Sequence, residues 1–316
     1  MHRRLMIALA SLACWGIGAD KPKPATTAPP SGNAVIRGKT GSSEIVITTT
    51  DRLAGAIHSL RWGGKEFIDS YDHGRQLQSA ASFDCATGKA FVPECFNPTE
   101  AGSAADGVGD KSSSKLLRVS AKGPELRTTT HMAFWLAPGG KSGGQPALND
   151  AVLSRHLVSK RVRIGYKKLT NVIEYEVTFT VPKGERHTLA QFEALTGYMP
   201  PEFGRFWMFL PGSGELKALS DGPGEQPFPV VLATENGQHA MGIYSPDQPS
   251  RGFWLAGYGR TRFVAQKVVK WNCVFRVRDA NGVAAGDYRY RMFVAVGTQE
   301  DVRQALASLV DEFAGR

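Results

Sequence analysis

The chain has 316 residues with a formal net charge of +9, and 42% of its residues are hydrophobic. Beyond the first 19 residues, no apolar run is long enough to cross a bilayer as a helix, so a polytopic helical membrane protein is excluded. The Lys and Arg residues are dispersed and often alternate with apolar residues, which is typical of the outer faces of strands. We therefore expect no nucleic-acid partner, while an acidic glycan remains open as a ligand.

Residues 1–19 predict a secretory signal peptide. A basic start is followed by a short apolar run with small residues near its end, and cleavage is expected after Ala19. The alternative is a lipoprotein signal in which Cys14 is lipidated, and this anchor would be the protein's contact with a membrane. Either way the protein is expected to be exported, to the periplasm or outside the cell.

Residues 20–34 are rich in Pro, Thr, Ser and Lys and predict a disordered tether. The rest of the chain, residues 35–316, is long enough to bury a large core. An all-β protein of this size can be one domain, and one domain is our prediction.

Most of this region consists of short segments rich in β-branched and aromatic residues, many with alternating polar and apolar positions. In one of them, for example, Glu174 and Glu176 fall on the same face. The Asn236-Gly237 pair is a strong signal for a hairpin turn. We expect strands at residues 44–50, 55–62, 115–121, 126–136, 152–166, 172–181, 189–195, 205–210, 229–234, 239–245, 253–258, 268–278 and 287–296.

The end of the chain departs from this pattern and predicts a helix. Residues 298–301 resemble an N-cap followed by an acidic first turn. The apolar residues that follow recur on one helical face, which would pack on a sheet: Val302, Leu306, Leu309, Val310 and Phe313.

The densest polar segment runs from residue 72 to residue 107, and loops of this kind on a rigid sheet often carry binding or catalytic groups. Its side chains can exchange hydrogen bonds with sugar hydroxyls. We expect Arg75 to bind a hydroxyl or a carboxylate, while His73, oriented by Asp72 or Asp69, moves a proton. The alternative is a salt-bridged loop without a ligand. The other expected site residues of this segment are Gln76 and Asn97 for binding and Glu100 for acid or base chemistry.

Later segments could form further walls of a cleft. Strand alternation places His131 and Trp135 on one face, and a Trp ring suits the C–H face of a sugar. His156 is a second candidate from a strand, although a histidine there can simply be hydrogen-bonded. Gln191, Glu193 and Leu195 share a face, and Tyr198 follows shortly after them. These residues could form a second wall of the cleft, in which Tyr198 binds the ligand and Glu193 acts as an acid or base. In a glycosidase, Glu100 with Glu193 or Asp106 could supply the two carboxyl groups, about 5–10 Å apart.

Cysteine spacing predicts one disulfide, between Cys85 and Cys95, because both flank a short turn in a protein expected to be exported. Cys273 is expected to be free and buried. The His and Cys residues are too far apart in the sequence for a zinc motif, so we expect no metal and no cofactor.

Many strands and hairpins in one domain predict an all-β fold, a large antiparallel two-sheet supersandwich with one C-terminal helix. The strand pattern, the polar loops, the turn at residues 242–247 and the last strand before the helix, residues 290–298, resemble the galactose mutarotase-like β-supersandwich over residues 35–313. That superfamily binds carbohydrate in a cleft on a concave sheet, and it includes aldose epimerases, polysaccharide lyases and non-catalytic domains of glycosidases. The Asn-His motif of the epimerases is not found in this sequence, so no epimerase residue is carried over.

The resulting hypothesis is an exported protein that binds or acts on a poly- or oligosaccharide in such a cleft. If it is an enzyme, it is a glycosidase, a lyase or an epimerase. The alternative is a non-catalytic carbohydrate-binding protein or a structural protein of the cell envelope.

Overall fold

The computed structural model describes residues 30–314 of the chain. The predicted signal peptide, Cys14 and most of the predicted tether lie outside the described residues. Among the described residues, no helix is long and apolar enough to span a membrane. The predicted all-β class is confirmed, since strands make up most of the regular structure and a single α-helix, α1 (Gln299–Phe313), follows the last strand.

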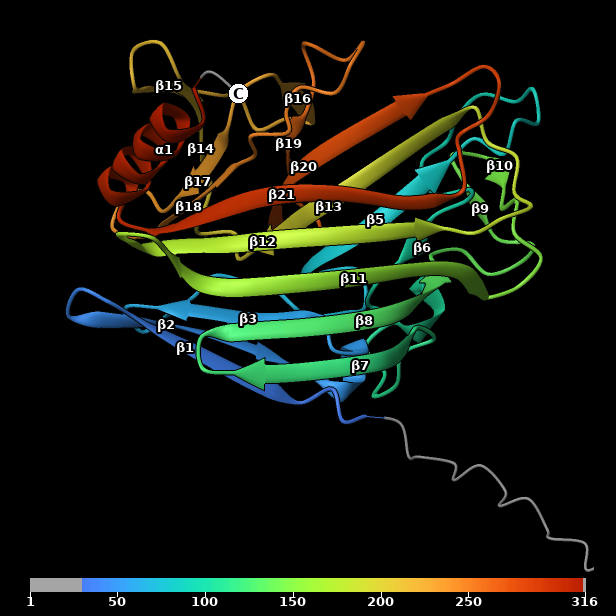
Figure 1. Ribbon diagram of the computed structural model, residues 1–316, viewed down its shortest axis with the longest axis horizontal. Helices are drawn as coiled ribbons and strands as arrows, with labels where there is room; N and C mark the ends of the chain where they lie inside the picture. The colour runs from blue at the N-terminus through green and yellow to red at the C-terminus, as the bar shows by residue number, and fades with distance from the viewer. Residues whose placement is uncertain (1–29, 315–316) are drawn as a thin grey trace, which may run out of the picture.

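The strands form two layers, and each strand pairing in residues 30–314 is antiparallel (Figure 1). The first layer, named the β11 sheet, follows the order β7 (Lys115–Lys122), β8 (Glu125–Phe134), β11 (Leu153–Tyr166), β12 (Leu169–Val181), β21 (Gly286–Gly297), β18 (Ala240–Tyr244), β17 (Val230–Ala233), β14 (Arg205–Leu210) and β15 (Glu215–Ala218).

The second layer, named the β13 sheet, carries the candidate site. Its order is β1 (Ala34–Thr40), β2 (Ser43–Thr49), β3 (Ile57–Trp62), β5 (Leu77–Phe83), β13 (Leu189–Met199), β20 (Val268–Arg278), β19 (Tyr258–Phe263) and β16 (Gly224–Gln226). The short β6 (Pro98–Thr99) pairs with β5 and β8 and so joins the two layers. The remaining elements are β4 (Lys65–Glu66), the pair β9 (Lys141–Ser142) and β10 (Gln145–Pro146), and the 3₁₀ helices η1 (Asp51–Leu53) and η2 (Ala104–Asp106).

The main core lies between the two layers and follows from strand alternation. On β12, Tyr175, Val177 and Phe179 point inward, while the polar residues between them face outward as predicted. They meet Phe192 of β13, whose ring lies 5.0 Å from the ring of Phe179. Burying each such side chain contributes about 1.5–3 kcal/mol, so the alternation fixes which face of every strand is left for solvent or ligand.

Helix α1 covers part of the outer face of the β11 sheet. Thr298 and Asp301 form a reciprocal capping box at its start, as the sequence indicated. The predicted apolar face is buried at Val302, Leu306, Leu309 and Phe313, against β18 and β21.

Two local predictions are wrong. The expected strand at residues 253–258 is mostly turn, and β19 begins only at Tyr258. Cys85 and Cys95 are not bonded to each other: the buried Cys95 thiol donates to the carbonyl oxygen of Gln145 at 3.6 Å. Cys85 occupies a left-handed backbone position after β5, where burial raises the pKa of its thiol to about 12. Cys273 is free and buried, as expected.

Candidate functional site

A cleft of about 530 Å³ lies on the face of the β13 sheet that points away from the core. Alternate residues of β5 build one part of its floor, while Leu77, Ala81 and Phe83 between them belong to the core. The floor continues across β13 and β20. The floor residues are Gln78, Ala80, Ser82, Glu193, Thr196, Tyr198, Val268 and Lys270.

A β-bulge sets the composition of this floor. The pairing of β13 shifts register between Glu193 and Leu195 against β20, and between Glu193 and Thr196 against β5. The sequence pattern placed Leu195 on the same face as Glu193, but the bulge turns Leu195 into the core, where it is fully buried. Thr196 and Tyr198 therefore come onto the cleft face beside Glu193.

An ion pair occupies the centre of the floor. The ammonium group of Lys270 lies 3.1 Å from the carboxylate of Glu193, and the Thr196 hydroxyl donates to the same carboxylate at 2.7 Å. Burial alone would raise the pKa of Glu193, but the charge of Lys270 and these hydrogen bonds outweigh it and lower the pKa below its usual value. Burial would lower the pKa of Lys270, and the Glu193 carboxylate raises it instead. Both groups are therefore charged at neutral pH.

Aromatic side chains border the floor. The rings of Tyr198 and Phe263 are nearly parallel, with centroids 6.3 Å apart, and the Lys270 ammonium lies 5.3 Å from the Tyr198 ring. Trp135 lies on the other side, against the backbone of Gly74: a Cβ at Gly74 would lie 2.7 Å from the indole ring. A side chain at position 74 would displace this ring, so the glycine is required by the close approach.

Polar groups from loops complete the rim. The Arg75 guanidinium pairs with Asp72 at 3.1 Å and donates to the carbonyl oxygen of Gln266 at 3.4 Å, across the cleft mouth. The Asn97 amide donates to the Ala81 carbonyl oxygen at 2.6 Å. The buried side-chain oxygen of Gln78 has no hydrogen-bond partner within residues 30–314.

Six of the predicted site residues thus line one cleft: Asp72, Arg75, Asn97, Trp135, Glu193 and Tyr198. The other predicted residues lie outside it, and each is held by protein groups. The two ring nitrogens of His73 each lie 2.8 Å from a backbone carbonyl oxygen. Gln76 donates to the carbonyl oxygen of Asp72, and His131 contacts that of Ser154. Glu100 forms a fully buried ion pair with Lys160 in the interior.

His156 belongs to a different cluster. Its imidazole meets Glu185 and His187 near the ends of β11 and β12, and their ligand atoms are close enough to hold a metal ion. No sequence signal marks this group, because His156 and Glu185 are 29 positions apart. Lys270 carried no signal either, since only the folded sheet places its charge beside Glu193.

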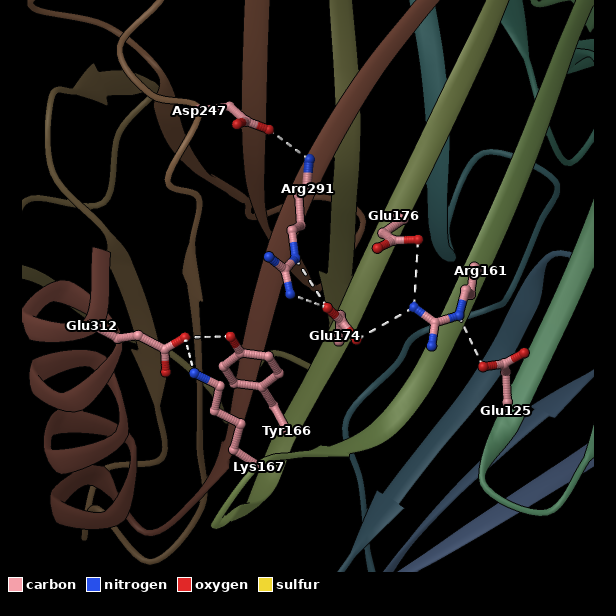
Figure 2. A network of polar contacts seen from close by, with 9 residues as sticks. All are labelled: Glu125, Arg161, Tyr166, Lys167, Glu174, Glu176, Asp247, Arg291 and Glu312. Carbon is pink, nitrogen blue, oxygen red and sulfur yellow. Dashed lines mark hydrogen bonds and ion pairs between the residues drawn. The ribbon is translucent and has the colours of Figure 1, made fainter. Parts of the chain in front are cut away.

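Two other polar regions are closed by their own ion pairs. A hollow of about 820 Å³ is larger than the cleft, but its charged groups pair with each other, as Arg262 does with Asp221 at 2.9 Å. On the outer face of the β11 sheet, Figure 2 shows Glu174 of β12 between Arg161 of β11 and Arg291 of β21. Neither region presents aromatic walls together with unpaired polar atoms, so the cleft is the better candidate site.

No protein-family model and no curated protein matches the chain. Several solved structures are similar to it at low sequence identity. A protein in glycosyl hydrolase family 38 from Enterococcus faecalis is 10% identical, with a TM-score of 0.49 over 90% of this chain and 32% of its own. The α-galactosidase from Lactobacillus brevis is 7% identical, with a TM-score of 0.44 over 86% of this chain and 40% of its own.

A galactose mutarotase-like protein from Lactobacillus casei is 10% identical, with a TM-score of 0.43 over 83% of this chain and the whole of its own. This chain therefore spans well under half the length of the first two proteins and the full length of the third. A galactose mutarotase-like protein is thus among the solved structures that this chain is similar to, in line with the resemblance expected from the sequence.

Proposed function

We propose that this protein binds a carbohydrate in the cleft of the β13 sheet. The observation that carries the proposal is the cleft's composition: Trp135, Tyr198 and Phe263 border a floor of amide, hydroxyl and charged groups. Aromatic rings pack against the C–H faces of sugars, while polar groups at fixed positions exchange hydrogen bonds with sugar hydroxyls. A volume of about 530 Å³ is within the usual range of small-ligand sites.

The charges of the cleft favour a neutral sugar over an acidic one. Its lining contains two basic residues, Arg75 and Lys270, and three acidic ones, Asp72, Glu94 and Glu193. The basic groups are each paired with a carboxylate at about 3 Å. The net positive charge of the chain is thus not concentrated at this site, and a uronate would meet no free cation on the floor.

The sequence-based expectation of export is part of the same proposal. A signal peptide at residues 1–19, or a lipid on Cys14, would place the protein among the glycans outside the cytoplasm.

The binding test is a glycan array followed by titration of the best hit. We expect Trp135→Ala to weaken binding about tenfold, which corresponds to a loss of about 1.4 kcal/mol. Trp254→Ala is the matched control, because Trp254 is exposed and lies outside the cleft. Equal affinity of the Trp135→Ala variant and the wild type would refute the placement of the ligand.

A catalytic role is the second candidate, and the ionised Glu193 on the floor favours it. A carboxylate held in its charged form can act as a general base on a bound sugar. We expect Glu193→Gln to abolish turnover of the array hit while affinity changes less than tenfold, measured by product analysis and titration of the same samples. If the wild type forms no product from a sugar that it binds, the protein is a binding module.

A further inference from the structure

We propose that His156, Glu185 and His187 bind one divalent transition-metal ion of the zinc class, at a site separate from the cleft. The Nε2 atoms of the two histidines lie 2.7 and 2.9 Å from the same carboxylate oxygen, Oε2 of Glu185. All three ligand atoms lie within 4.8 Å of one another. Two imidazoles and one carboxylate are a ligand set that zinc uses, with metal–ligand distances of about 2.0–2.2 Å.

These distances require little rearrangement. In a tetrahedral site with the metal–ligand distances of zinc, ligand atoms are separated by roughly 3.3–3.5 Å. The two Nε2 atoms would therefore move away from Oε2 by roughly 0.4–0.8 Å to admit the ion, and they would approach each other from their present separation of at most 4.8 Å. Side-chain rotation at the surface-facing Glu185, which is 12% exposed, can supply this movement.

The backbone around the cluster holds the ligands in place. His156 is on β11, and Glu185 and His187 are on the loop between β12 and β13. The carbonyl oxygen of His187 accepts a hydrogen bond from the amide of Val283 at 2.7 Å, which fixes the end of this loop.

Outer contacts orient the ligands further. Arg155 donates to the other carboxylate oxygen of Glu185, Oε1, at 3.3 Å, so Oε2 is directed at the histidines. The ring of Phe83 lies 4.8 Å from the His156 ring and 4.5 Å from that of His187. Contacts of this kind hold metal ligands in position, although Nδ1 of His187 has no hydrogen-bond partner among the described residues.

A metal here would keep one open coordination position. The two histidine side chains are almost fully buried, at 3% and 2% exposure, and three protein ligands would leave the fourth position of a tetrahedral ion to a water. The ion would tie the β12–β13 loop to β11. That loop leads directly into β13, which carries Glu193 and Tyr198 of the cleft floor.

The test uses the chain without a histidine tag, dialysed against a chelator and then titrated with ZnCl₂. We expect one equivalent of zinc to bind, measured by calorimetry and by elemental analysis after gel filtration, and the melting temperature to rise by several degrees. Glu185→Gln keeps the shape of the side chain, and we expect it to weaken zinc binding at least tenfold. His187→Gln should weaken it further.

His131→Gln is the matched control, because His131 is a strand histidine whose imidazole contacts a backbone carbonyl oxygen outside the cluster. It should still bind one equivalent. The proposal is overturned if the wild type binds no zinc, or if Glu185→Gln and His187→Gln bind it as tightly as the wild type. In either case the three side chains form a hydrogen-bonded group only.

Discussion

At the floor of the cleft, Lys270 and Glu193 keep each other charged although both are largely buried. Replacing Lys270 with Met preserves the length of the side chain and removes the countercharge. Burial then acts on Glu193 alone and raises the pKa of its carboxyl. The ion pair therefore determines over which pH range the floor can accept hydrogen bonds from a ligand.

We expect sugar binding by the wild type to be constant between about pH 5 and pH 8, because Glu193 stays ionised above its lowered pKa. In Lys270→Met, binding should weaken as the pH falls through the raised pKa of Glu193. Titrations of the glycan-array hit at several pH values measure this, with Lys267→Met, on the exposed loop nearby, as control. Flat profiles for both variants would show that Glu193 does not contact the ligand.

Residue by residue, the sequence indicated the composition of the site better than its geometry. The polar density of residues 72–107 pointed to Asp72, Arg75 and Asn97, which the structure places in one cleft. It could not show that His73 and Glu100 turn away, because their partners, such as the Gly107 carbonyl oxygen and Lys160, are set by tertiary packing. Side-chain direction in a loop has no periodicity from which it could be inferred.

Between elements, three strands of the β11 sheet are linked through one carboxylate. Glu174 of β12 accepts hydrogen bonds from Arg161 of β11 at 3.4 Å and from Arg291 of β21 at 2.9 Å (Figure 2). Its side chain is only 8% exposed, so solvent screens these interactions weakly. Glu176 lies two residues further along the same face, is 46% exposed and contacts Arg161 at 3.5 Å.

We expect Glu174→Gln to lower the free energy of unfolding by about 1–3 kcal/mol, since the two arginines lose the charge of their shared carboxylate and one of its two acceptor oxygens. Glu176→Gln should change it by less than about 1 kcal/mol, as is usual for an exposed ion pair. Urea unfolding followed by circular dichroism measures both variants. Equal effects of the two substitutions would contradict a special role for the buried carboxylate.

Elements with regular alternation could be predicted from the sequence, and the helix could be predicted from its cap and apolar face. The bulge in β13 could not be predicted, because in the sequence an extra residue in a strand cannot be distinguished from regular strand residues until the pairing partners are known. Residues 253–258 were assigned to a strand because they are apolar, although Trp254 and Leu255 are exposed in a turn. Apolar content without alternation is therefore a poor predictor of a strand.

At the scale of the whole molecule, two sheets with a shared core leave one face of the β13 sheet free for a ligand. Antiparallel pairing and the terminal helix were expected from the sequence, whereas β1 and β5 were not. The sequence could not predict which face of the sheet would carry the cleft, because the position of the cleft depends on the conformation of the surrounding loops.

The cleft has two parts of different origin. Its floor consists of strand residues whose neighbours along the chain form the core, so a change there disturbs the folding of the protein as well. Its rim includes Arg75, Asn97 and Gln266 from loops, and none of these three side chains belongs to that core, although Phe96 beside Asn97 does. Substitutions at the rim can therefore change which ligand is bound at little cost in stability, whereas substitutions in the floor are opposed by selection for stability. Directed evolution of this protein should begin with the rim loops.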